Sequence, residues 1–305
     1  MITNKKSLKF TLSIISILLI MAIITGCDSG PETSTYDLNL NKEGEGEIIV
    51  EPDEELYDED TTVSLTAEPE EDWDFAYWEG LKNTKAETKV VMDSDKTING
   101  IFGEILFEDD FSDDSSGWST GKTESDVDDD DEKETTGEFK YTDNEKYSIK
   151  ILEPGYSVWD YLPIDEYPGN YLIEFDAQFA EDDFAKDNYG NYGIIFNYED
   201  KSNYSWFVIN SHGKYAIVDK EDEPDMIVDW TSDEEINTEE NLLNKITLLK
   251  IKDDYYFYIN DKLIEKVSIE TNSDASIGLM GSSSDNSEPP VEVLFDNFKA
   301  LNLSN

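Results

Sequence analysis

The sequence contains no arginine, and it has one cysteine, Cys27, and one histidine, His212, among 305 residues. A single cysteine excludes a disulfide within the chain and any site built from several thiolates. One histidine without cysteine partners cannot form the common zinc sites. His212 lies in Asn210-Ser211-His212-Gly213, a pattern typical of a turn between two strands, where histidine is most often a surface residue.

Cationic side chains are also scarce, since 23 lysines stand against 72 acidic residues and give a net charge of −49. Nucleic acids and anionic lipid surfaces are bound by clustered Lys or Arg. The charge balance therefore excludes nucleic acid as a partner and argues against electrostatic docking to a membrane. The apolar content of 38% and aromatic content of 12% are sufficient for packed cores.

So large a negative charge destabilises a compact state through self-repulsion, and salt screens that repulsion. We therefore hypothesise a protein adapted to salty surroundings, with an acidic surface that merely keeps the protein soluble as the alternative. The melting temperature is expected to rise with NaCl concentration, and a flat or falling series would contradict the hypothesis.

The N-terminus has the pattern of an export signal. Three lysines, Lys5, Lys6 and Lys9, precede an apolar run from Phe10 to Ile24 that is short for a membrane span. Ile24-Thr25-Gly26-Cys27 resembles the bacterial lipoprotein lipobox. The resemblance implies that residues 1–26 are removed, that Cys27 carries lipid, and that the protein is exported and anchored to the membrane on its extracytoplasmic side.

The alternatives at the N-terminus are an ordinary signal peptide and an uncleaved anchor with a chance cysteine. After removal of the three signal lysines, 20 basic residues remain and the charge becomes 20 − 72 = −52. Residues 27–35 are small and polar, which predicts a flexible tether.

Residues 36–103 alternate short apolar and polar stretches with turns, which predicts a small β module. Thr62-Val-Ser-Leu-Thr-Ala67 followed by Pro69, then Phe75…Trp78…Gly80, then Met92-Asp-Ser-Asp-Lys96…Phe102 resemble the divergent internalin-type B-repeat. The departures are Asp72-Trp73, where the family usually has Gly-Tyr, and the acidic residues of the Asp53–Asp60 turn, where Gly is common. The resemblance implies a β-grasp-like spacer or adhesive module without catalytic residues. The aromatic cluster Trp73–Trp78 is interpreted as core.

Residues 104–305 show recurrent strands and no helical period, which predicts an all-β sandwich. Residues 112–137, rich in Ser, Gly, Thr and acids, are predicted to be a loop. Asp110-Phe-Ser112…Gly117-Trp118, Tyr192-Gly-Ile-Ile-Phe196 and Phe295-Asp-Asn-Phe298 resemble the concanavalin A-like (laminin-G-like) jelly rolls. This fold hosts lectins, enzymes and adhesion modules, so it implies no single activity.

An enzymatic alternative rests on Glu174-Phe-Asp176-Ala-Gln178. On a strand, period two places Glu174, Asp176 and Gln178 on one face. β-Glucanases of the same fold carry Glu-x-Asp-x-Glu there, the carboxylate pair that retaining glycosidases need. Gln178 occupies the position of the second glutamate, so an acid/base is missing. A strand with one solvated face explains the segment without chemistry.

Two acidic groups suggest calcium. The run Asp126–Glu132 lacks the Gly and Glu positions of an EF-hand loop and is interpreted as a solvated loop. Resemblance to the jelly rolls implies a structural Ca²⁺ near the paired terminal strands. The candidate oxygen ligands are Asp109, Asp110, Asp113 and Asp296.

Exposed aromatic rings can stack on sugars while nearby polar groups bind hydroxyls. The candidate ligand-binding residues are Trp159, Tyr161, Tyr192, Tyr204, Trp206 and Trp230. Alternation places Tyr204 and Trp206 on one strand face. About half of such rings fill the core, and the sequence does not say which.

The sequence thus predicts a lipid-anchored, non-enzymatic envelope protein whose β-repeat spacer carries a jelly roll that binds carbohydrate or another surface ligand. A glycoside hydrolase or lyase and a purely structural surface protein are the alternatives. No cofactor is expected apart from the structural Ca²⁺.

Overall fold

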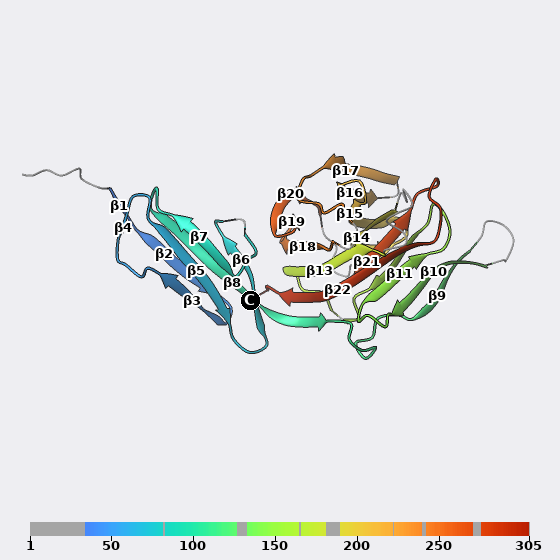
Figure 1. Ribbon diagram of the computed structural model, residues 1–305, viewed down its shortest axis with the longest axis horizontal. Helices are drawn as coiled ribbons and strands as arrows, with labels where there is room; N and C mark the ends of the chain where they lie inside the picture. The colour runs from blue at the N-terminus through green and yellow to red at the C-terminus, as the bar shows by residue number, and fades with distance from the viewer. Residues whose placement is uncertain are drawn as a thin grey trace, which may run out of the picture. The chain divides into compact units, whose positions relative to one another are not determined.

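The computed structural model describes residues 34–304, except positions 82, 127–132, 165, 181–189, 222, 240–241 and 271–275. The predicted signal, Cys27 and most of the tether lie outside the described residues. The described part of the chain consists of strands and connecting segments (Figure 1). No helix long and apolar enough to cross a bilayer occurs within it.

The strands fall into two groups along the chain. The first group is β1 (Thr35–Tyr36), β2 (Leu38–Glu43), β3 (Gly46–Glu51), β4 (Tyr57–Asp58), β5 (Thr62–Pro69), β6 (Trp73–Glu79), β7 (Glu87–Val91) and β8 (Lys96–Asp109). The second group begins with β9 (Gly121–Asp126), β10 (Lys133–Tyr141), β11 (Tyr147–Ile151), β12 (Ser157–Tyr161), β13 (Tyr171–Phe179), β14 (Gly190–Asp200) and β15 (Asn203–Asn210). It ends with β16 (Lys214–Glu221), β17 (Glu223–Ser232), β18 (Asn244–Ile251), β19 (Asp254–Ile259), β20 (Lys262–Ser268), β21 (Ser276–Ser283) and β22 (Val291–Asn302).

In the N-terminal module, β3, β5 and β7 form an antiparallel sheet, and β8 pairs in parallel with β2 and antiparallel with β6. Trp78 is fully buried and packs on Phe75 with ring centroids 4.8 Å apart. Its indole N–H donates to the Lys85 carbonyl at 2.9 Å. The interpretation of the aromatic cluster as core is confirmed for Trp78 and Phe75, and Trp73 packs half-buried against the same core.

The predicted domain boundary after residue 103 falls inside β8. The first part of this strand pairs with β2 and β6, and its end pairs with β22, from Phe298 opposite Asp109 to Asn302 opposite Glu104. Ala76 and Ile101 also share an apolar cluster with Leu172, Leu249 and Tyr258. The two predicted parts of the chain are therefore connected by one continuous strand.

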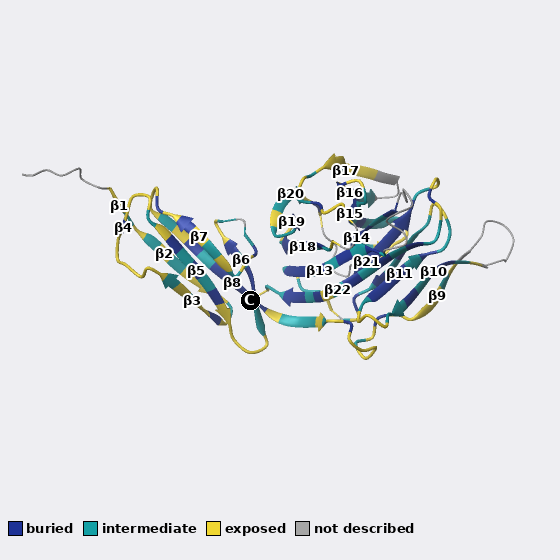
Figure 2. Cartoon of the chain, in the orientation of Figure 1, coloured by how far each residue is buried: buried dark blue, intermediate teal, exposed yellow. Residues whose placement is uncertain are grey.

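The C-terminal domain is an antiparallel β-sandwich. One sheet has the order β20-β19-β18-β13-β22-β11-β10-β9, and a six-stranded sheet has the order β12-β21-β14-β15-β16-β17. Side chains that alternate along each strand bury one face of each sheet between them, as the dark blue strands of Figure 2 show. Phe175 and Ala177 come from one sheet, and Phe196 and Phe207 from the other. The predicted all-β jelly-roll class is confirmed by this strand arrangement.

The prediction of a loop over 112–137 is wrong in part. Residues 121–126 and 133–141 form β9 and β10, which pair with each other and extend the sheet beyond β11. The cause is that Gly137 and Phe139 are buried with the half-buried Glu138 between them, an alternation that the charged composition and a bulge between Thr135 and Gly137 obscure. Most of the acidic run, residues 127–132, lies outside the described residues.

Candidate functional site

The outer face of the six-stranded sheet, the face turned away from the sandwich core, carries side chains in rows set by the strand register. One row across β12, β21, β14, β15 and β16 consists of Trp159, Met280, Gly193, Val208 and Ala216. The next consists of Tyr161, Gly278, Ile195, Trp206 and Val218. On β15 burial alternates from Tyr204 to Phe207, since Ser205 and Phe207 are buried while Tyr204 and Trp206 are half-buried.

Five aromatic side chains on this face form a continuous series, here called the aromatic ribbon: Trp159, Tyr161, Tyr198, Tyr204 and Trp206. The ring centroid of Tyr198 lies 5.1 Å from that of Tyr161 and 5.8 Å from that of Trp159. Tyr198 and Tyr204 stack at 6.2 Å with 22° between their planes, and Tyr204 lies 5.3 Å from Trp206. The ribbon crosses from β12 to β15, about 14 Å at the usual strand spacing.

The ribbon rests on an apolar base. Ile195, Val208, Ala216 and Met280 point to the outer face and are buried beneath the half-buried rings. A side chain supported by such a base loses little conformational freedom when a ligand binds. The ribbon is therefore a preformed surface rather than a set of mobile rings.

The rings also carry neutral polar groups. The Trp159 indole N–H donates to the Tyr161 hydroxyl at 2.8 Å. Burial raises the pKa of Tyr161, and burial together with Tyr198 raises the pKa of Tyr204, so both hydroxyls stay protonated at neutral pH. The ammonium of Lys220 lies 5.2 Å from the centroid of the Tyr204 ring. Flat faces flanked by hydroxyls and one ammonium can contact a polar ring-shaped ligand.

Of the six predicted ligand-binding residues, the structure brings Trp159, Tyr161, Tyr204 and Trp206 together in the ribbon. Tyr192 does not join them, because it points into the sandwich core, is 3% exposed, and accepts a hydrogen bond from Asn244 Nδ2 at 2.8 Å. Trp230 lies on β17, is 40% exposed, and lines a separate pocket.

Sequence reasoning missed Tyr198. Strict alternation from Phe196 would turn Tyr198 inward, but β14 has a bulge between Phe196 and Asp200 that shifts the following side chains. The bulge contains Asn197 with φ of 52°, a conformation that asparagine tolerates better than most residues. Asn197, an asparagine inside an alternating strand pattern, is the feature of the sequence that could have indicated this bulge.

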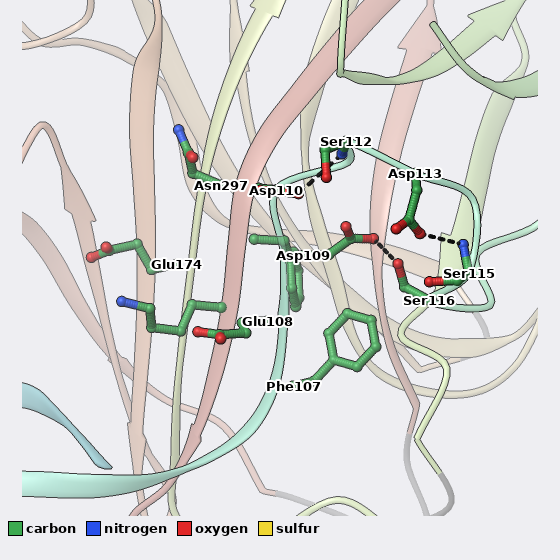
Figure 3. A pocket seen from close by; sticks show the side chains of 12 residues that line it. Phe107, Glu108, Asp109, Asp110, Ser112, Asp113, Ser115, Ser116, Glu174 and Asn297 are labelled. Carbon is green, nitrogen blue, oxygen red and sulfur yellow. Dashed lines mark hydrogen bonds between the residues drawn. The ribbon is translucent and has the colours of Figure 1, made fainter. Parts of the chain in front are cut away.

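The predicted calcium residues Asp109, Asp110 and Asp113 line a cavity of about 710 Å³ beside Glu174 and Lys299 (Figure 3). Each carboxylate accepts hydrogen bonds from its own loop: Asp109 from Ser116 Oγ at 2.5 Å, Asp110 from Ser112 N at 3.0 Å, and Asp113 from Ser115 N at 2.8 Å. Hydrogen bonds from the side chain and then the backbone of Ser112 lower the pKa of Asp110, and those from the side chain and backbone of Ser115 lower the pKa of Asp113.

Asp296, the fourth predicted ligand, forms an ion pair with Lys146 at 2.5 Å and is not among the residues lining this cavity. Within the described part of the chain, no three or more His, Cys, Asp or Glu side chains are grouped to hold a metal ion. The four carboxylates do not fit a preformed ligand set, and calcium binding stays a prediction.

The candidate glycosidase strand is β13, where Glu174, Asp176 and Gln178 share the outer face as expected. Glu174 Oε2 lies 2.9 Å from the Lys245 ammonium and accepts from Thr247 Oγ1 at 3.1 Å. Asp176 accepts from Asn297 Nδ2 at 2.9 Å. This strand belongs to the larger sheet, so its carboxylates lie on the sheet opposite the aromatic ribbon.

A comparison with family models agrees with the strand pattern of the N-terminal module. Residues 36–105 match the divergent InlB B-repeat domain. The match covers the B-repeat alone and ends inside β8, close to the boundary expected from sequence. No curated protein matches the chain.

Solved structures similar to this chain include the carbohydrate-binding module CBM66 from Bacillus subtilis, with 12% identity, 60% of this chain and 96% of that chain covered, and a TM-score of 0.41. A Bacillus licheniformis β-glucanase has 11% identity, with 65% of this chain and 96% of that chain covered, and a TM-score of 0.44. The catalytic domain of a Thermotoga petrophila laminarinase has 10% identity, with 67% of this chain and 99% of that chain covered, and a TM-score of 0.43. These structures include a binding module and a catalytic domain.

Proposed function

We propose that the sandwich domain binds carbohydrate through the aromatic ribbon and that it does so without catalysis. The observation that supports this most is the unbroken contact of Trp159, Tyr198, Tyr204 and Trp206 on an apolar base, across about three strand spacings. A strip of aromatic rings of this length suits an extended polysaccharide better than a single small molecule.

The proposal of a binding protein rather than a hydrolase draws on the position of the carboxylates. Glu174 and Asp176 are engaged by Lys245 and Asn297, and Gln178 replaces the second glutamate of the glucanase pattern. General acid catalysis needs a carboxyl that can give up a proton to the bound substrate. The ribbon sheet is not the sheet that carries these groups.

We place this domain at the cell envelope, exported and anchored through lipid on Cys27, with the B-repeat as its spacer. The lipobox-like Ile24–Cys27 segment and the acidic chain support this view, since a net charge of −49 disfavours attachment to anionic lipid by charge alone. The same charge supports the proposal of a salty working environment.

A glycan array probed with the full chain at high salt tests the proposal. Wild type is expected to bind at least one polysaccharide class, and Tyr204→Ala is expected to lose that signal. Tyr256→Ala is the matched control, because Tyr256 is also half-buried with a lysine over its ring, Lys266 at 5.0 Å, but lies on the larger sheet. Equal loss with both variants would contradict the ribbon as the binding surface. No binding at all by wild type would contradict the proposal and favour a purely structural protein.

A further inference from the structure

A second pocket lies on the same outer face, beyond the end of the aromatic ribbon. It is a cavity of about 430 Å³ lined by Asn191, Asn210, His212, Lys214 and Trp230, with Gly190 and Ser284 at its rim. Asn191 pairs across the strands with Asn210 and with Ser282. Asn210 lies four residues from Trp206 on β15, about 13 Å along the strand. One oligosaccharide could therefore reach both places.

The pocket offers an aromatic wall and polar atoms in fixed positions. Trp230 is among the few large apolar side chains that are exposed. Asn210 Oδ1 accepts from the backbone N–H groups of His212 at 3.0 Å and Lys214 at 3.2 Å, which holds the turn in place. Asn191 Nδ2 donates to Ser282 Oγ at 2.9 Å, so its Oδ1 is left as an acceptor. An apolar wall with few convergent polar groups is the usual composition of a ligand site.

The charge of this pocket is opposite to that of the chain. Its titratable lining residues are Lys214 and His212, and none of the described residues that line it is Asp or Glu, although acids outnumber bases 72 to 23 in the sequence. Lys214 forms no ion pair with any described residue. The neighbouring carboxylate of Asp233 turns to its own loop, where it accepts from Glu235 N at 2.9 Å.

From these observations we infer that the pocket binds an acidic sugar unit, with its ring against Trp230 and its anionic group at the Lys214 ammonium. The inference rests on the proposed function and deepens it, because it makes the ligand an acidic polysaccharide. A carboxylate of a uronic acid and a sulfate ester share the required chemistry, a compact anion that accepts hydrogen bonds from an ammonium.

Two matched pairs of polymers distinguish the carboxylate from the sulfate: polygalacturonate against its methyl ester, and dextran sulfate against dextran. Binding of the full chain is measured by calorimetry at 0.5 M NaCl, where long-range repulsion from the acidic chain is screened. Wild type is expected to prefer the acidic member of one pair by about tenfold, and Lys214→Gln to abolish that preference while leaving affinity for the neutral member unchanged. Trp230→Ala is expected to weaken binding of the acidic member.

Lys252→Gln is the control, since Lys252 is likewise an exposed lysine at a hairpin, in the turn between β18 and β19 of the larger sheet, whereas Lys214 begins β16 directly after its turn. A preference that survives Lys214→Gln, or that Lys252→Gln removes equally, would overturn the inference. If wild type binds neutral polymer in a Tyr204-dependent way without any acidic preference, the pocket inference fails and the proposed function stands. If no polymer binds, the proposed function itself fails.

Discussion

Replacement of Trp206 by alanine is expected to weaken binding of the polysaccharide by about 30-fold, corresponding to about 2 kcal/mol of binding free energy. Trp206 forms one end of the aromatic ribbon, 5.3 Å from Tyr204, and lies beside the buried Ile195 across the strand pair. Its removal takes away the largest flat face on β15 and also opens the apolar base to water. Trp206→Phe keeps a flat ring and is expected to lose much less affinity.

Calorimetric titration of both variants with the polysaccharide identified on the array checks this prediction. A circular dichroism spectrum and melting curve for each variant separate loss of the ring from loss of the fold. Affinity of Trp206→Ala within twofold of wild type would place the binding surface elsewhere on the sandwich.

The second large effect is expected in the core, where Asp160→Ala should lower the free energy of unfolding by about 3 kcal/mol. Asp160 is buried on the inner side of β12 and accepts four hydrogen bonds. They come from Ser119 N and Oγ at 2.7 Å each, from the Tyr147 hydroxyl at 2.6 Å and from Tyr161 N at 3.1 Å. Tyr147 is fully buried, and burial raises the pKa of its hydroxyl. Without the carboxylate, the Ser119 and Tyr147 donors lose their acceptor, and the segment before β9 that contains Ser119 is held less firmly.

Urea unfolding monitored by tryptophan fluorescence measures this loss. Asp219→Ala is the matched control, because Asp219 accepts a single side-chain hydrogen bond, from Ser205 Oγ at 2.7 Å, and should cost about 1 kcal/mol. A change for Asp160→Ala no larger than that of Asp219→Ala would show that the four hydrogen bonds contribute little net stability.

Local periodicity was enough to predict much of the fold. The alternation on β15 predicts the shared face of Tyr204 and Trp206, and that on β13 predicts the shared face of Glu174, Asp176 and Gln178. The turn at Asn210–Gly213 is confirmed between β15 and β16, with Gly213 N donating to Asn210 O at 3.2 Å. These features depend on neighbours in sequence, which a single chain displays directly.

Features set by distant pairing could not be predicted in this way. Tyr192 and Tyr204 look alike in sequence, yet one is buried and the other lies in the ribbon, because strand order decides which face meets the core. Tyr198 reaches the ribbon only through the bulge at Asn197. The pocket at Trp230 combines residues from β14, β15, β16 and β17, so the absence of Asp and Glu among the described residues that line it appears only in three dimensions.

The most direct test of the ribbon as the binding surface uses the six tryptophans of the chain, whose indole N–H signals in a ¹H–¹⁵N NMR spectrum report six separate places. On addition of the polysaccharide, the signals of Trp159 and Trp206 are predicted to shift, together with that of Trp230 when the ligand is acidic. Those of Trp73 and Trp78 in the B-repeat and of the buried Trp118 are predicted to stay in place. Shifts confined to Trp73, Trp78 or Trp118, with Trp159 and Trp206 unmoved at saturation, would contradict the account.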